Sequence, residues 1–298
     1  NGCVEACDGT SVIHEALPVT VAQIGVSLVS YRGDLGTWVQ RLFRRDLRVN
    51  ALDPIEEAVK LLDQRSNREG FDVESSRDKL TNLTRRGIMA YAERAILGYK
   101  STALWRMGHG NPIPYELLTG GGLVIRGDMP LLTKSLVVWR SLLLDNKRWL
   151  YIPSAPTNRV YITLGYALGP LEYALIDTPT KVMLDIVNGH LPQGLKNSAK
   201  TFVEEAGPNI VIGLYRAALE APPYVFYAHQ EHAHEAALIA MADSLLQEHR
   251  GFPLLIDLAD TVCRATFGMD AFSVAVQQGY AAAGAPFRYL GERQTRSK

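Results

Sequence analysis

The stretch Val4-Glu5-Ala6-Cys7-Asp8-Gly9-Thr10, followed by the apolar run from Val19 to Tyr31, decides the fold that we expect. It predicts a short strand that carries Asp8 at its end, a tight turn at Gly9, and a longer strand that returns beside the first. An Asp-Gly pair is common in hairpin turns for backbone reasons alone. Its meaning therefore depends on which acidic residues the rest of the chain supplies.

The composition is that of an ordinary soluble globular protein. The chain has 298 residues, 47% of them hydrophobic and 21% charged, which is enough for one large α/β domain or two smaller ones. No apolar run is long enough to span a bilayer, so we expect no membrane segment. Three cysteines do not suggest a disulfide framework, and we expect a cytoplasmic protein. Because the sequence begins at Asn1, we expect the natural N-terminus to be missing or trimmed.

The charge balance bears on nucleic-acid binding. Lys plus Arg and Asp plus Glu number 31 each, whereas a free-standing DNA-binding domain usually has a basic excess. This balance argues against tight autonomous binding of nucleic acid. It fits a protein whose DNA is delivered by a partner, or one that binds no DNA.

Helix and strand patterns alternate along the chain, which predicts an α/β fold. Residues 34–66 have apolar residues at helical spacing and a second helix start at Asp53-Pro54, so we expect a helical segment there. Further helices are expected at about 76–99, 131–144, 235–248, 253–267 and 271–283. Strands are expected at about 123–125, 148–152, 159–168, 210–214, 224–228 and 285–290. The pattern of residues 169–208 favours no particular element.

The opening pattern resembles the N-terminal signature of the NurA nucleases, an apolar strand that ends in Asp-Gly-Ser and a second strand rich in Gly and Val. Here it stands as Ala6-Cys7-Asp8-Gly9-Thr10 and Val21 to Val29. The resemblance is best over 4–31, 76–100, 122–132 and 251–290, and poor over 169–208. It implies a single domain over 1–298, an α/β ribonuclease-H-like mixed sheet with helical insertions, one of them at about 34–66.

The resemblance also implies a metal site. The family places an Asp on the first strand, a Glu on the next long helix, an Asp on the next strand and a further residue on a C-terminal helix. Two-metal phosphodiester hydrolysis needs such carboxylates to hold cations about 3.5–4 Å apart, and Mn²⁺ or Mg²⁺ suits an oxygen shell. The matching residues, expected to be both catalytic and metal-binding, are Asp8, Glu93, Asp128 and Asp260.

Glu93 lies among Ala90, Ala92 and Ala95, whose small side chains would let a strand approach the helix closely. The alternative is an ordinary surface glutamate paired with a neighbouring arginine.

The third position departs from the family pattern. After Leu123 to Ile125, Arg126 stands where the family has aspartate, and Asp128 lies two residues on, about 6–7 Å further along an extended strand. Asp128 could serve as the ligand instead. Equally, it could cap the helix expected from Leu131.

The fourth position also departs from the family pattern. In Gly251 to Asp260, Phe252 stands for the family's tyrosine and Asp260 for its histidine, with the spacing kept. Aspartate can ligate a hard cation as histidine does. The alternative is an ion pair between Asp260 and Arg264, four residues on, and we expect Asp257 to be a solvated surface residue.

The activity implied by the resemblance is that of a Mn²⁺- or Mg²⁺-dependent deoxyribonuclease that acts on single strands and ends, in DNA repair or anti-phage defence. It also implies a homodimer docked on a hexameric HerA-type ATPase, which would supply the DNA. DNA contacts are expected from Arg41, Arg44, Arg45 and Arg126.

Two rival interpretations remain open. In one, the chain is a catalytically eroded subunit that acts as a scaffold or regulator of the ATPase, which Arg126 favours because a cation repels metal ions. In the other, it is an unrelated soluble α/β protein whose carboxylates never meet. A separate cluster lacks the spacing of a zinc enzyme, and the polar start of a helix explains it: His229, Glu231, His232, His234 and Glu235.

Overall fold

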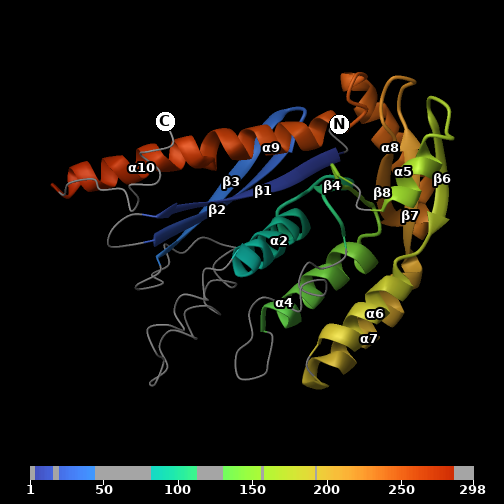
Figure 1. Ribbon diagram of the computed structural model, residues 1–298, viewed down its shortest axis with the longest axis horizontal. Coiled ribbons are helices and arrows are strands. Elements are labelled where there is room, and N and C mark those ends of the chain that lie inside the picture. Colours follow the sequence, from blue (N-terminus) through green and yellow to red (C-terminus); the bar gives the residue numbers. More distant parts are fainter. Residues whose placement is uncertain are drawn as a thin grey trace.

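The computed structural model describes residues 4–15, 20–43, 82–112, 130–155, 158–191 and 193–284. Its centre is an eight-stranded mixed sheet with the order β3-β2-β1-β4-β5-β8-β7-β6 (Figure 1). The strands are β1 (Val4–Glu15), β2 (Thr20–Ser30), β3 (Gly33–Phe43), β4 (Trp105–His109), β5 (Trp149–Ile152), β6 (Glu172–Asp177), β7 (Ile210–Arg216) and β8 (Tyr224–His229). The mixed α/β sheet expected from the sequence is confirmed.

The first five strands form one half of the sheet. β1, β2 and β3 are antiparallel neighbours, whereas β4 runs parallel to β1 and β5 parallel to β4. The pairing of the first two strands is confirmed, but the turn expected at Gly9 is wrong, because β1 continues to Glu15 and Gly9 pairs with Val26. Parallel neighbours need a crossover connection. Helix α2 (Asn82–Tyr99) supplies it before β4, and α4 (Pro130–Trp139) with the π-helical turn η2 (Arg140–Asp145) supplies it before β5.

The second half continues the sheet with antiparallel pairs, β5 with β8, β8 with β7 and β7 with β6. The helices after β5 in the chain are α5 (Arg159–Gly165), α6 (Thr180–His190), α7 (Gln193–Ala206), α8 (Ala233–Ser244), α9 (Leu254–Phe267) and α10 (Met269–Ala282), with short 3-10 turns η3 (Gly207–Asn209), η4 (Gln230–His232) and η5 (Leu245–Gln247). Within the described ranges, no helix has both the length and the apolar character needed to cross a membrane.

Two other predicted elements are wrong. The helix expected from residue 34 is strand β3 as far as Phe43, because this segment pairs with β2 along its whole length and pairing overrides helical spacing. The strand expected at 159–168 is helix α5, whose start is capped by the Asn158 side chain accepting the Val160 N–H at 2.9 Å. The remainder of the expected helical insertion, 44–66, lies outside the described residues.

Most of the other expected elements are confirmed. The helices near 76–99, 131–144, 235–248, 253–267 and 271–283 correspond to α2, α4 with η2, α8 with η5, α9 and α10. The strands near 148–152, 210–214 and 224–228 correspond to β5, β7 and β8. The unassigned region 169–208 contains β6, α6 and α7, and the strands expected at 123–125 and 285–290 lie outside the described residues.

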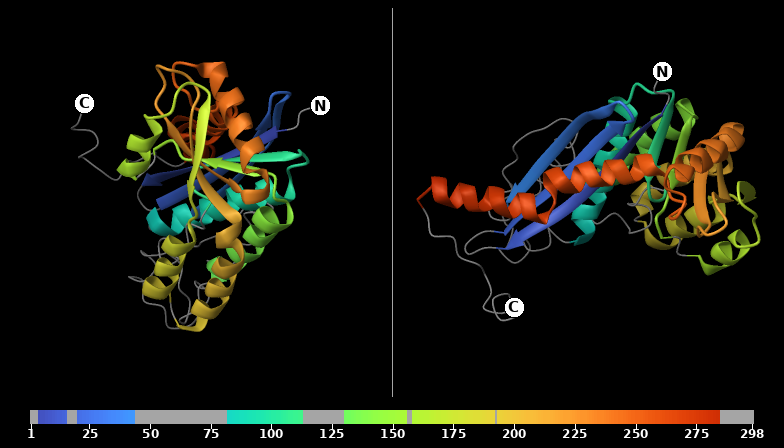
Figure 2. Two further views of the ribbon diagram at one scale, coloured as in Figure 1. Left: turned by 90° about the vertical axis from the view of Figure 1, so that its right-hand side faces the viewer. Right: turned by 90° about the horizontal axis from the view of Figure 1, so that it is seen from above.

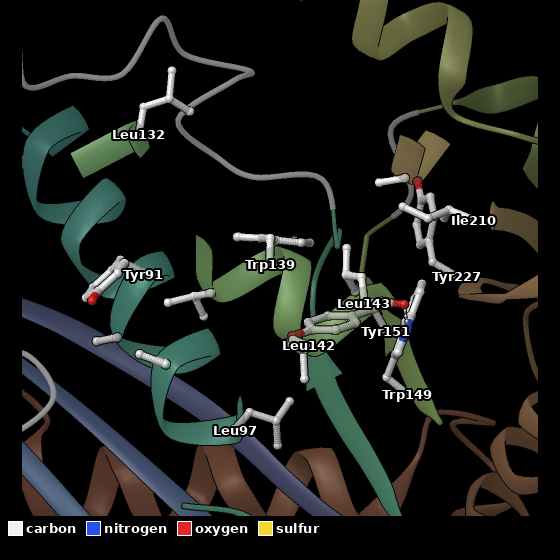
Figure 3. Close-up of a cluster of buried hydrophobic side chains, with 14 of the residues drawn as sticks. Tyr91, Leu97, Leu132, Trp139, Leu142, Leu143, Trp149, Tyr151, Ile210 and Tyr227 are labelled. Carbon is white, nitrogen blue, oxygen red and sulfur yellow. Dashed lines mark hydrogen bonds between the residues drawn. The ribbon is translucent and has the colours of Figure 1, made fainter. Parts of the chain in front are cut away.

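Helices cover both faces of the sheet, and each face has its own hydrophobic core. One core joins α2, α4, α6 and α7 to the sheet, and its aromatic part contains Tyr91, Trp139, Trp149 and Tyr151 (Figure 3). The opposite core lies under α8 and α9. Helices α9 and α10 run over the strands of the first half, as the view from above makes plain (Figure 2).

The residues of β2 that face α9 let this helix lie close to the sheet. The Gln23 side chain donates to the Phe267 carbonyl at 3.0 Å, and the Ser27 hydroxyl donates to the Ala259 carbonyl at 2.7 Å. Between them, a Cβ on Gly25 would stand 2.2 Å from the Phe267 ring, so only glycine fits. These contacts fix the height and rotation of α9, which carries Asp260.

Candidate active site

Asp8 and His109 lie where two parallel strands separate. β1 and β4 are in register from Val4 opposite Trp105 to Cys7 opposite Gly108, and the next residues are Asp8 and His109. Asp8 Oδ1 accepts the Gly9 N–H at 2.9 Å and lies 3.3 Å from His109 Nδ1. The Asp8 side chain is only 6% exposed, so these contacts fix it.

Glu93 reaches the same place from α2. The helix crosses β1 closely enough for the Cys7 thiol to lie 3.4 Å from the Glu93 carbonyl, as a donor. A Cβ built on Gly9 would stand 2.5 Å from Glu93 Oε1. The glycine of the Asp-Gly pair therefore makes room for a second carboxylate beside Asp8, a role that a hairpin turn does not explain.

Arg94 holds Glu93 and the end of β4 together. Its Nη1 donates to the Ala90 carbonyl at 2.7 Å and its Nη2 to the Asn111 carbonyl at 2.9 Å, and Nη1 lies 3.5 Å from Glu93 Oε2. The guanidinium also lies over the Trp139 ring, 4.6 Å from its centroid. With a side chain 6% exposed, Arg94 is a buried structural cation.

Asp260 approaches from the other side of the sheet, on α9. Its carboxylate Oδ1 pairs with Arg264 Nε at 2.7 Å, the ion pair that the sequence offered as an alternative. The Asp260 side chain is half-buried, whereas that of Arg264 is 72% exposed.

One pocket collects these side chains. It has a volume of about 320 Å³ and is lined by Asp8, Glu93, His109 and Asp260, among others. A neighbouring pocket of about 520 Å³ shares Asp8, His109 and Asp260. The structure thus places three of the four expected site residues on one pocket, and the fourth, Asp128, lies outside the described residues.

The electrostatics reflect this crowding of negative charge. Burial alone would lower the pKa of His109, but its hydrogen bond to Asp8 and the charges of Asp8, Glu93 and Asp260 raise it overall. Burial, together with the charge of Asp8, raises the pKa of Asp260, against the opposing effects of Arg264 and His109. A divalent cation would relieve the same repulsion.

The donor set suits a hard or borderline cation, since it consists of carboxylates and an imidazole. As the side chains stand, no three His, Cys, Asp or Glu residues in the described part of the chain are grouped closely enough to hold a metal ion. Glu93 and Asp260 are instead paired with Arg94 and Arg264.

The sequence interpretation missed His109. The strand that follows helix α2 is β4, and His109 ends it beside Asp8. The alternation of buried Trp105 and Met107 followed by His109-Gly110 is the signal that could have revealed it. The strand expected before Arg126 and Asp128 lies outside the described residues, where their roles stay predictions.

Phe252 also contributes to the site. It is buried and its ring meets that of His109 edge-on, with 6.0 Å between centroids. It therefore limits the orientations open to the imidazole.

The arginines expected to contact DNA are only partly within the described residues. Arg41 is in β3, opposite Gln23, and Arg44 and Arg45 fall outside the described residues, so their DNA contacts stay predictions.

The histidine-rich cluster is satisfied by local partners. His229 is buried and accepts the Glu231 N–H at 3.2 Å, and Glu231 pairs with Lys147 at 2.7 Å. His232 lies 3.1 Å from a Glu235 carboxylate oxygen. These contacts agree with the interpretation of the cluster as the polar start of a helix.

Comparison with known proteins gives a structural likeness. No protein-family model matches the sequence, and no curated protein matches it either. The crystal structure of the NurA nuclease from Sulfolobus solfataricus matches with a TM-score of 0.53 at 11% identity, over 94% of this chain and 84% of that one. Another NurA structure matches with a TM-score of 0.48 over 88% and 84%, and one with manganese with 0.43 over 87% and 85%, both at 11% identity. The chain therefore has the fold of the NurA nuclease, a mixed α/β fold of the ribonuclease-H-like kind, as the resemblance implied.

Proposed function

We propose that this chain is a divalent-metal-dependent deoxyribonuclease that hydrolyses phosphodiester bonds in the pocket of Asp8, Glu93 and Asp260. One observation carries the proposal: these carboxylates come from β1, α2 and α9, and line one pocket in a chain with the NurA fold. Such convergence from distant elements is what metal-assisted phosphodiester hydrolysis requires.

The residues present fit Mn²⁺ or Mg²⁺. Asp8, Glu93, Asp260 and His109 would hold the cation, with Asp128 as a further candidate. When bound, the cation supplies a Lewis acid and an activated water at the phosphate. Asp8 is held by the Gly9 N–H and His109 through Oδ1, and no described residue bonds to its Oδ2, which is thereby available to a cation.

The other residues of the site position these ligands. Arg94 holds Glu93 against β1 and ties α2 to the segment after β4. Phe252 and Asp8 together restrain the His109 ring. Such supporting contacts commonly orient metal ligands.

The substrate that we propose is DNA, as single strands and ends. A hexameric HerA-type ATPase is the proposed partner and a homodimer the proposed assembly, both carried over from the family resemblance. The equal numbers of acidic and basic residues agree with a nuclease to which DNA is delivered.

The test is cleavage of linear single-stranded DNA with Mn²⁺ by the wild type, by Asp8→Asn and by a matched control, Asp185→Asn, on the exposed face of α6. Asp8→Asn should lose at least ~10²-fold in rate, as expected for an electrostatic group at the reacting centre. Its melting temperature without metal should not fall, because a buried carboxylate near other negative charges is unfavourable. Unimpaired cleavage by Asp8→Asn would remove Asp8 from the site.

A catalytically eroded subunit is the second candidate. It is favoured by the pairing of Glu93 and Asp260 with arginines and by the lack of a three-ligand group in the described part of the chain. In that case the wild type would bind the ATPase but cleave no DNA with Mn²⁺ or Mg²⁺, even with the ATPase present. If Arg126 is the cause, Arg126→Asp should restore activity.

A further inference from the structure

We propose that three arginines, Arg86, Arg250 and Arg264, hold successive phosphates of one DNA strand across the carboxylate pocket. This inference rests on the proposed function, because it names how the same site holds its substrate. We refer to these residues as the arginine track.

The positions of the three residues follow the two pockets. Arg86 lines the pocket of about 320 Å³, Arg250 lines the neighbouring pocket of about 520 Å³, and Arg264 lines both. Asp8 and Asp260 also line both pockets, so the carboxylates lie at the junction. A strand that passes from one pocket to the other would meet a cation on each side of the carboxylates and one beside them.

The elements that carry the track explain this arrangement. Arg86 lies seven residues before Glu93 on α2, two helical turns away on the same face. Arg264 lies one turn after Asp260 on α9. The folding that brings the carboxylates together therefore also brings these arginines to the pocket.

Arg86 and Arg264 have guanidinium nitrogens available to a ligand. Arg86 is exposed and makes no hydrogen bond or ion pair with any described residue. Arg264 uses Nε for Asp260, and among the described residues neither of its terminal nitrogens has a partner. Its 72% exposure leaves the planar fork open to a phosphate, which guanidinium binds in a bidentate way.

Arg250 is more engaged than the other two. Its Nη1 donates to Asp257, and its guanidinium lies 5.8 Å from the Phe252 ring centroid. The side chain is still 49% exposed, and exposed ion pairs are weak, so a phosphate can join or replace this contact. Arg94, the other arginine of the smaller pocket, is excluded because it is buried and both its terminal nitrogens bind carbonyl oxygens.

The negative charge of the pocket also predicts that DNA binding by the arginine track depends on a divalent cation. Asp8 and Asp260 at the junction, with Glu93 in the smaller pocket, repel phosphates until a cation neutralises them. DNA binding should therefore be weak without a divalent cation and stronger with Ca²⁺, a hard cation that occupies oxygen sites.

The experiment measures binding of a fluorescein-labelled single-stranded oligodeoxynucleotide to the full chain by anisotropy, with Ca²⁺ and over a series of salt concentrations. The variants are Arg86→Gln, Arg250→Gln, Arg264→Gln and the triple variant. The matched control is Arg140→Gln. Arg140 is an arginine that pairs with Glu205 and lines neither pocket.

Each phosphate contact in single-stranded DNA contributes about 0.7 to the slope of log affinity against log salt. Each single variant should therefore lower the slope by about 0.7 and weaken binding about fivefold at ~0.1 M salt, and the triple variant about 100-fold. Arg140→Gln should bind like the wild type. Arg264→Lys should keep the slope, because its charge remains, but bind more weakly, because the bidentate fork is lost.

The arginine track would be overturned if the three single variants bound DNA with the same affinity and the same salt slope as Arg140→Gln. It would also be overturned by a wild type that binds DNA no better with Ca²⁺ than without it. If the wild type cleaves DNA with Mn²⁺ while the variants bind normally, the track fails and the proposed function stands. If the variants lose binding as expected but the wild type cleaves nothing, the track stands and the proposed function fails.

Discussion

Gly9→Ala is the substitution that separates function from stability most sharply. The added Cβ would stand 2.5 Å from Glu93 Oε1 and 2.9 Å from Met89 Cγ. Both distances are shorter than 3.0 Å, and Cβ atoms in proteins essentially never approach another atom so closely. The nearest atom is the end of a flexible side chain, so the clash can be relieved by moving the Glu93 carboxylate. We therefore expect the variant to fold and to lose the geometry of the site.

The loss of stability should be small and the loss of activity large, because the clash is relieved by moving a site side chain. Overpacking costs about 1–3 kcal/mol, and replacing glycine returns about 0.4–1 kcal/mol by restricting the unfolded chain. Because Glu93 can rotate away, we expect the free energy of unfolding to fall by about 1 kcal/mol, which corresponds to a fall in melting temperature of about 2–4 °C. A displacement of about 1 Å at a reacting centre can cost ~10²-fold in rate.

Two assays on the same sample check this expectation, a thermal melt and cleavage of linear single-stranded DNA with Mn²⁺. A third readout is the stabilisation by Mn²⁺, which at 100 times the dissociation constant is about 2.7 kcal/mol for one site and should be reduced in Gly9→Ala. Gly98→Ala is the matched control, because it lies on α2 with nothing within 4 Å of the added Cβ. It should gain ~0.5–1 kcal/mol and keep full activity. Wild-type cleavage and Mn²⁺ stabilisation in Gly9→Ala would refute the placement of Glu93 in the site.

Three further substitutions test the surroundings of the site. Burial raises the pKa of Asp243 to about 6 despite the Leu255 N–H bond, so the free energy of unfolding should fall as pH rises from about 4 to about 6. Asp243→Asn should remove that pH dependence, as urea unfolding at a series of pH values would measure. Gly25→Ala should cost about 1–3 kcal/mol, because its Cβ would stand 2.2 Å from the Phe267 ring, and Phe267→Leu in the same chain should recover part of the loss, as thermal melts would measure. His109→Asp should lower the melting temperature of the metal-free protein, since it adds a carboxylate beside Asp8, and should raise the ratio of Mg²⁺- to Mn²⁺-supported cleavage, because carboxylate is the harder ligand. A melting temperature that is unchanged or higher in His109→Asp would contradict the crowding of negative charge at the pocket.

The sequence predicted that the segment of Asp8 pairs with the apolar run that follows, because strand patterns are local signals, but it placed the turn at Gly9, whereas β1 continues to Glu15. It predicted α9 equally well, since Pro253 precedes a clean helical pattern. It failed at β3, where residues with helical spacing pair with β2, and at α5, where a single cap at Asn158 outweighs β-branched residues. Both outcomes depend on partners that no local pattern contains.

For the candidate site too, residues in segments with a local signal were predicted, and a residue whose role depends on strand pairing was not. Asp8, Glu93 and Asp260 could be named because each lies in a recognisable segment, and the structure places them on one pocket. His109 was missed: the alternating pattern before it indicates a strand, but its place beside Asp8 depends on β4 being in register with β1. The same register explains Gly9, which looked like a turn residue and lies within β1 with Glu93 against it.

The measurement that tests the central claim most directly is a crystal structure of this chain with Mn²⁺ and anomalous diffraction at the manganese edge. We expect an anomalous peak in the pocket, about 2.2 Å from carboxylate oxygens of Asp8 and of at least one of Glu93 and Asp260, with Asp260 parted from Arg264. A pocket without a peak, in which Asp8 contacts only Gly9 and His109 and Arg264 still pairs with Asp260, would contradict a metal-dependent nuclease.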